Sequence, residues 1–139
     1  LRQSLATIAA MPFTPLKIVG MDDKVVPSRE PNSALVTVTL FLSERAPHEW
    51  QNYFNQAWQQ HIYMLKRRAN VVGKNINIHC VLEELEKDHL PELKKIVAAT
   101  NEAYARHAEA QHAREQAEAA RTAKIQQDVR DIKGRIKFD

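Results

Sequence analysis

The strongest constraint on the fold is a long segment without helix breakers in the C-terminal half of the chain. Between Glu92 and Lys133 there is no Gly or Pro, and from residue 103 onward most residues are good helix formers. One helix from Asp88 to Lys133 would be about 68 Å long at 1.5 Å per residue. Because this length exceeds the diameter of a small domain, we expect the second half of the helix to extend from the globule.

An apolar seam lies near the end of this helix. Ile125, Val129, Ile132 and Ile136 follow one another at spacings of four, three and four residues, which is the heptad spacing of a coiled coil. An alanine-rich seam in a different register precedes them, which predicts a stutter or two different partners along one helix. The alternative is a solitary charged helix. We favour self-association or a partner helix, because four large apolar side chains would otherwise face water.

The first two-thirds of the chain contains segments with the residue patterns of strands and of a helix. Strands are expected at residues 16–21, 34–43 and 75–82, where apolar and polar residues alternate. A helix is expected from Pro47 to about Ala69, because its apolar residues follow the helical period. With the long helix, this gives the order β-β-α-β-α. The prediction is an α+β fold with a small three-stranded sheet and its helices on one face.

Three segments follow from these elements. Residues 1–10 are expected to form a short helix or the end of a truncated or foreign segment. Residues 11–102 are expected to form the α+β head domain, and residues 103–139 a charged, Ala-rich helix for coiled-coil or other helical association. The element order is similar to that of small α+β modules that bind RNA. However, the chain has neither a GxxG motif nor an aromatic run on a strand, so the similarity identifies no family.

The distribution of charge points to a second function. The net charge is only +3, but no acidic residue occurs in the window 50–82. The sheet face away from the helices would place aromatic and polar side chains near the cations of this window, a combination that suits RNA or DNA. A polar sheet face in water and cations at a helix end explain the same pattern without any ligand. The candidate contacts are Lys66, Arg67, Arg68, Lys74, Phe41 and His79.

No catalytic, cofactor or metal site is predicted. The chain has no GxSxG, HExxH, P-loop or GxGxxG motif. His107 and His112 are five residues apart, about 140° around a helix, so they cannot share a metal ion. Cys80 is expected on the core face of its strand. Glu84 and Asp88 could form a carboxylate pair, but they fit a solvated helix start better.

The sequence therefore predicts a non-catalytic oligomerising or adaptor module that uses the C-terminal helix for association. The alternative is a nucleic-acid-binding accessory protein that uses the window 50–82 and the open sheet face. No stretch approaches the length of an apolar membrane span, and a single cysteine is compatible with a reducing compartment. We therefore expect a cytoplasmic protein without a membrane partner.

Overall fold

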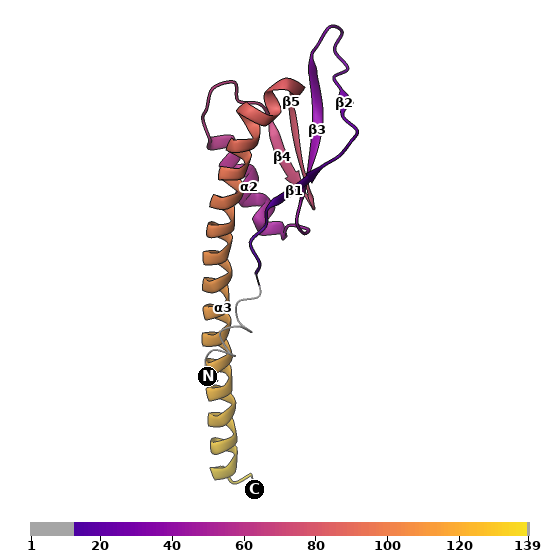
Figure 1. The fold of residues 1–139 in the computed structure, drawn as a ribbon. Coiled ribbons are helices and arrows are strands. Elements are labelled where there is room, and N and C mark those ends of the chain that lie inside the picture. Colours follow the sequence, from indigo (N-terminus) through magenta and orange to yellow (C-terminus); the bar gives the residue numbers. More distant parts are fainter. Residues whose placement is uncertain (1–12, 139) are drawn as a thin grey trace. The chain divides into compact units, whose positions relative to one another are not determined.

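A computed structural model describes residues 13–138 of the chain (Figure 1). Residues 14–105 form one compact unit, and residues 106–138 belong to a second. The strands are β1 (Ile18–Met21), β2 (Val26–Pro27), β3 (Leu35–Leu42), β4 (Ala69–Val72) and β5 (Asn75–Val81). The helices are α2 (His48–Gln60) and α3 (Leu90–Arg135), with two short turns, η1 (Leu82–Glu84) and η2 (Leu85–His89), before α3. The short helix expected within residues 1–10 lies outside the described residues.

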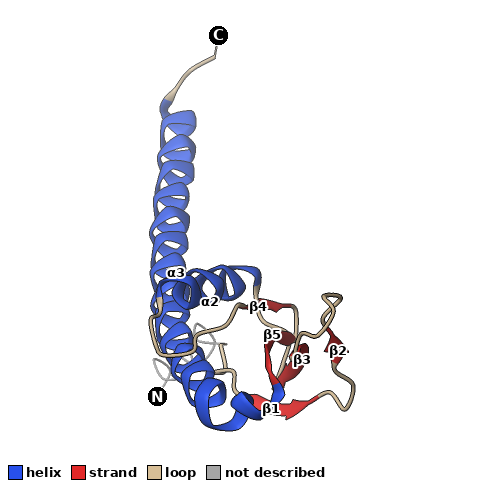
Figure 2. Ribbon diagram, turned by 90° about the horizontal axis from the view of Figure 1, so that it is seen from above, coloured by secondary structure: helices blue, strands red, loops and turns tan. Residues whose placement is uncertain are grey.

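The strands form a single antiparallel sheet in the order β1-β3-β5-β4, and β2 also pairs with β3. Figure 2 shows α2 and the start of α3 on one side of this sheet. The predicted α+β class with a long C-terminal helix is confirmed. The sheet has five strands, however, so the prediction of three strands is wrong.

The two missed strands are short and lie in segments with conflicting signals. β2 has only two residues and contains Pro27, which is tolerated because the strand pairs on one side only. β4 was assigned to the end of the preceding helix and its turn. Its four residues alternate between buried and exposed, and Val71 is 1% exposed. The connection from β4 to β5 is a tight hairpin in which Gly73 adopts φ +64°, a conformation that suits glycine.

The core lies between the sheet and the two helices. The predicted inward face of β3 is largely confirmed, because Val38, Leu40 and Leu42 are buried, and Cys80 on β5 is also fully buried. The helical layer contributes a stacked aromatic row from α2 and an aliphatic stripe from α3. The buried helical residues are Trp50, Phe54, Trp58, Leu93, Ile96 and Val97.

The helix predicted over residues 47–69 ends much earlier, at Gln60. Ile62 and Leu65 continue the helical spacing of apolar residues, but they are 89% and 55% exposed. His61 has extended backbone geometry, which ends the helix, and the Lys66 ammonium group donates hydrogen bonds to carbonyl groups at the helix end. The helical spacing of apolar residues therefore continues into a loop whose apolar side chains face solvent.

The boundaries of the last two elements also differ from the prediction. β5 ends at Val81, and Leu82 is 44% exposed in the turn that follows. The long helix is predicted to begin at Asp88, but this residue lies inside η2, and α3 begins at Leu90. Asn101 on α3 fixes the segment that precedes β1. Its side chain bonds both backbone groups of Leu16 and accepts a hydrogen bond from Trp50 Nε1 at 2.9 Å.

Candidate functional site

The sheet face opposite the helices carries the polar residues that the sequence placed there. Its cross-strand pairs are Thr37 with His79, Thr39 with Asn77, and Phe41 with Asn75. All six side chains are partly exposed. Thr39 Oγ1 donates to Asn77 Oδ1 at 2.8 Å, and Thr37 Oγ1 lies 3.2 Å from His79 Nδ1. The face is therefore a polar, ordered surface with one aromatic ring.

A groove of about 700 Å³ lies at one end of this surface. Thr37, Asn77 and His79 contribute from the sheet, and residues 66–70 and Trp58 contribute from the chain beside it. The groove brings four of the six predicted nucleic-acid contacts together, namely Lys66, Arg67, Arg68 and His79. Phe41 and Lys74 are not among its lining residues.

Two of the basic residues in the groove are already engaged within the protein. Lys66 donates to the carbonyl groups of Trp58, Gln59 and His61, so its charge satisfies the C-terminal end of α2. Arg67 binds the Glu84 carboxylate through two hydrogen bonds of 3.1 and 3.2 Å. These two cations therefore have structural partners, which reduces the charge available for a phosphate.

The other two basic candidates are exposed but lie at opposite ends of β4. Arg68 precedes β4 and lines the groove, and its carbonyl group accepts a hydrogen bond from His79 N at 2.9 Å. Lys74 lies in the hairpin after β4, next to the pair of Phe41 and Asn75. Since β4 has four residues at about 3.3 Å each, Arg68 and Lys74 belong to separate parts of the surface. The predicted basic cluster is thus divided.

A network of polar side chains connects the groove residue Arg67 with the buried His89 through Glu84. Glu84 Oε1 lies 3.1 Å from Nε2 of His89, a fully buried residue, and His89 Nδ1 lies 2.8 Å from the Tyr63 hydroxyl. A carboxylate can only accept, so His89 Nε2 carries a hydrogen and donates it to Glu84. Sequence reasoning gave no role to His89 or Tyr63, because nothing local marks a partner 26 residues away.

This hydrogen-bonded network shifts the pKa values of Glu84 and Tyr63, the groups at its two ends. Hydrogen bonds from Arg67 and His89 lower the pKa of Glu84 to about 2. Burial raises the pKa of Tyr63 to about 12, assisted by the negative charge of Glu92. Glu84 therefore stays charged and Tyr63 neutral over the whole physiological range. The network is rigid and fully paired, as expected for a structural element.

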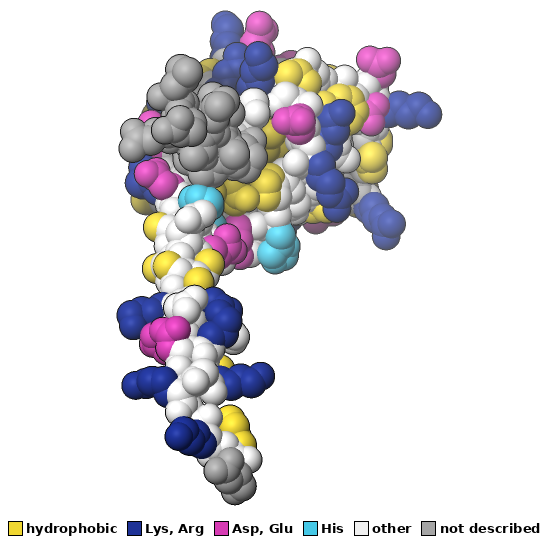
Figure 3. Space-filling model, turned by 90° about the horizontal axis from the view of Figure 1, so that it is seen from below, with side chains coloured by type: hydrophobic (Ala, Val, Ile, Leu, Met, Phe, Trp, Pro, Cys, Tyr) yellow, Lys and Arg dark blue, Asp and Glu magenta, His cyan; other side chains and the backbone are white. Residues whose placement is uncertain are grey.

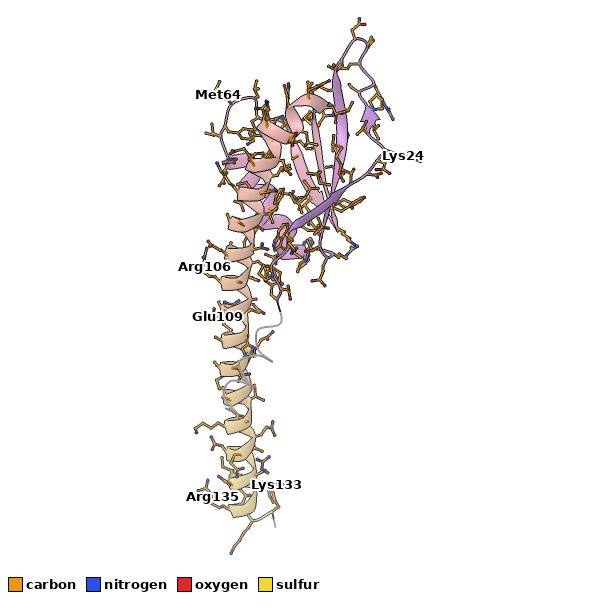
Figure 4. The ribbon with its side chains drawn as sticks, in the orientation of Figure 1. Lys24, Met64, Arg106, Glu109, Lys133 and Arg135 are labelled. Atoms are coloured by element: carbon orange, nitrogen blue, oxygen red, sulfur yellow. The ribbon has the colours of Figure 1, made fainter. Side chains whose placement is uncertain are left out.

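The loop between α2 and the groove residues 66–70 exposes apolar side chains. Ile62 and Met64 are 89% and 87% exposed, and Figure 4 shows Met64 pointing away from the ribbon. Their neighbours His61 and Tyr63 are held by the rest of the unit, since His61 Nε2 lies 2.7 Å from the Glu92 carboxylate and Tyr63 bonds His89. Leu65 adopts φ +61°, an unusual conformation for a branched residue. The loop is held in shape while its apolar tips face solvent.

The predicted association seam is also exposed. Every described residue from Ala113 to Phe138 is exposed, and the four seam residues are 45–51% exposed. Figure 3 shows Lys and Arg side chains projecting to either side of this helix, with apolar side chains between them. Ion pairs at i,i+4, such as Lys124 with Asp128 at 3.3 Å, support the helix without covering the seam.

The described residues offer no site for a metal ion, since no three of their His, Cys, Asp or Glu side chains converge. Among the same residues, no helix is both long and apolar enough to cross a membrane. Burial raises the pKa of the Cys80 thiol, which works against a thiolate nucleophile.

Asn70 is a groove residue that the sequence analysis missed. It is exposed on β4 opposite Asn77, and it was overlooked because β4 itself was not predicted. The alternation of Ala69, Asn70, Val71 and Val72 was the available signal.

The chain matches no protein-family model, and comparisons with curated proteins and with solved structures also find no match.

Proposed function

We propose that this chain is a non-catalytic association module that binds further copies of itself through the C-terminal seam of Ile125, Val129, Ile132 and Ile136. The observation that carries this proposal is their exposure of 45–51% at heptad spacing, with three residues on α3 and Ile136 directly after it. Each such side chain contributes roughly 1.5–3 kcal/mol when it is fully buried. Four of them are a substantial driving force that a solitary helix leaves unused.

The compact unit of residues 14–105 would then be the part that each copy brings to the assembly. Its core is complete, so it does not depend on the seam for its fold. This separation between a folded unit and an associating helix is the organisation of an adaptor. We also propose a cytoplasmic location, because Cys80 is a free, buried thiol that requires no oxidising compartment.

The test is the mass of the full chain in solution, measured by sedimentation equilibrium from low to tens of micromolar concentration. Ile132→Glu should shift the chain to monomers, because it places a charge in the seam. Ala123→Glu is the matched control, since it introduces the same side chain at an exposed position of the same helix outside the seam. A monomeric wild-type chain, or equal effects of both variants, contradicts the proposal.

A second candidate function is the binding of single-stranded nucleic acid in the groove. The observation that favours it is the convergence of Arg68, His79, Asn70 and Asn77 on one polar surface. Amide and imidazole groups can read the edge of an unstacked base, and the guanidinium group of Arg68 can bind a phosphate. Lys66 and Arg67 have internal partners, so we expect fewer phosphate contacts than the four suggested by the sequence.

This candidate predicts a shallow salt dependence. Each phosphate contact on a single strand contributes about −0.7 to the log–log slope of affinity against salt, so one or two contacts give a slope of about −0.7 to −1.4. Arg68→Ala should weaken binding of a single-stranded RNA to all sequences alike. Lys74→Ala is the control, because Lys74 does not line the groove. Absence of RNA binding at low salt excludes this function.

A further inference from the structure

The seam residues occupy defined heptad positions, and these positions constrain how many helices can pack together. Spacings of four, three and four residues assign Ile125 and Ile132 to position d, and Val129 and Ile136 to position a. All four residues lie within α3 or directly after its last turn. The seam therefore carries a β-branched side chain at every a and every d position from 125 to 136.

A β-branched residue at d is the informative feature. In parallel coiled coils, Ile or Val at a combined with Leu at d favours two strands, whereas Ile at both a and d favours a larger bundle. No Leu occurs between residues 94 and 139, so the pattern that favours two strands is absent from this part of the sequence. The seam thus has the composition of a bundle larger than a pair, and three helices are the smallest such bundle.

Symmetry then fixes the direction of the helices. Homo-oligomers almost always have closed point-group symmetry, and three identical helices can close only around a three-fold axis. A rotation about that axis keeps every helix pointing the same way, so the bundle must be parallel and in register. Antiparallel packing requires an even number of helices.

The flanking charges agree with the parallel arrangement. Asp128 occupies position g and Lys133 position e, and position g of one helix faces position e′ of its neighbour five residues further along in parallel bundles. Asp128 would therefore face Lys133 of the next copy. Both side chains are exposed, and Figure 4 shows Lys133 directed away from its own helix.

From these positions we infer that the seam assembles three copies of this chain into a parallel, in-register helical bundle, with Asp128 of each copy paired to Lys133 of the next. This inference rests on the proposed function and adds the number, direction and register of the helices. Each copy contributes the same seam residues, so no second kind of chain is required.

The first experiment changes only the branching at position d. The double variant Ile125→Leu and Ile132→Leu keeps the apolar volume but creates the pattern of two-stranded coiled coils. Sedimentation equilibrium of the full chain should give three chain masses for the wild type and two for this variant. The control is Val129→Ile, which retains a β-branched residue at position a and should leave three.

The second experiment tests direction and register. Asp128→Lys should raise the concentration at half-assembly about tenfold, because it places like charges together at three contacts. Lys133→Asp should weaken assembly to a similar degree, and the two changes combined should restore it. In an antiparallel pair, Asp128 would approach Arg135 instead, and Lys133→Asp would not rescue the first variant. Circular dichroism verifies that helix content is retained.

The outcomes separate this inference from the function on which it rests. A wild-type chain of two copies, a failed rescue, or a leucine variant that still forms three copies overturns the inference. A seam-dependent assembly of two copies would overturn the inference and leave the proposed function in place. A monomeric wild-type chain overturns both.

Discussion

Isoleucine occupies opposite environments in two regions of this molecule. Ile76 and Ile78 on β5 are fully buried, whereas Ile125 and Ile132 on α3 are 51% and 45% exposed. The compact unit of residues 14–105 has a buried core of large apolar side chains, while the helix beyond residue 112 buries none among its described residues. The folded unit therefore has its own core without the seam, and the seam side chains would be buried by the association that we propose.

The largest expected effect comes from the same substitution made in each region. Ile78→Ala removes a fully buried side chain and should lower the free energy of unfolding by about 2–5 kcal/mol. Ile132→Ala should change the stability of the isolated chain by less than about 0.5 kcal/mol, because its environment there is solvent. Chemical denaturation below the concentration of assembly measures both. Similar decreases in the free energy of unfolding for the two variants would contradict the claim that only the compact unit buries its isoleucines.

The tie between Leu16 and Asn101 is expected to have the next largest effect. Asn101→Ala leaves the two backbone groups of Leu16 and the indole nitrogen of Trp50 without their partner. The free energy of unfolding should fall by about 2 kcal/mol, since each unmet buried group is costly. Gln127→Ala, an exposed polar residue on the same helix, is the matched control and should be nearly neutral.

The buried network gives the compact unit an acid dependence that the seam lacks. The pKa of Glu84 is held near 2 in the folded chain, below its ordinary value of 4.5. A lowered pKa contributes stability above the ordinary value, and this contribution is lost as pH falls from 4.5 toward 2. Denaturation at several pH values should show this loss, and Glu84→Gln should reduce the slope within that range. An unchanged slope in the variant contradicts the assignment.

The smallest expected effect concerns the loop after α2. Leu65→Gly relieves a backbone φ of +61° and removes an exposed side chain, so stability should rise by about 0.5 kcal/mol. Ile62→Gly is the control in the same loop. Ile62 has no positive φ, so this change should lower stability by about 0.5–1 kcal/mol through the entropy of the unfolded chain. Thermal unfolding of both variants measures the difference.

Periodic features of the sequence predicted the fold well where the pattern and burial agree. The alternation in residues 34–43 and 75–82 located β3 and β5, and the absence of breakers located α3. The prediction failed at Ile62 and Leu65, whose spacing continues the helical period although neither is buried. Spacing alone does not distinguish a buried stripe from an exposed loop. Because the predicted helix ran on to about Ala69, β4 and its residue Asn70 were not predicted.

The arrangement of side chains around the groove could be predicted only in part, for a related reason. Lys66 and Arg67 of the acid-free window line a groove with polar residues of the sheet, but Glu84 lies in the turn after β5 and reaches Arg67 across the fold. A long-range pair of this kind leaves no mark in the local sequence. The pattern of the seam was easier to recognise, since three of its residues lie on α3 and the fourth, Ile136, follows directly, so that the spacing needs no tertiary contact to be seen.

The most direct test of the central claim is sedimentation equilibrium of the wild-type chain beside Ile132→Glu and Ala123→Glu at tens of micromolar concentration. We predict that the wild type and Ala123→Glu assemble, and that Ile132→Glu is monomeric with an unchanged free energy of unfolding for its compact unit. A wild-type chain that remains monomeric throughout this range would contradict the account, because the exposed seam would then have no function in association.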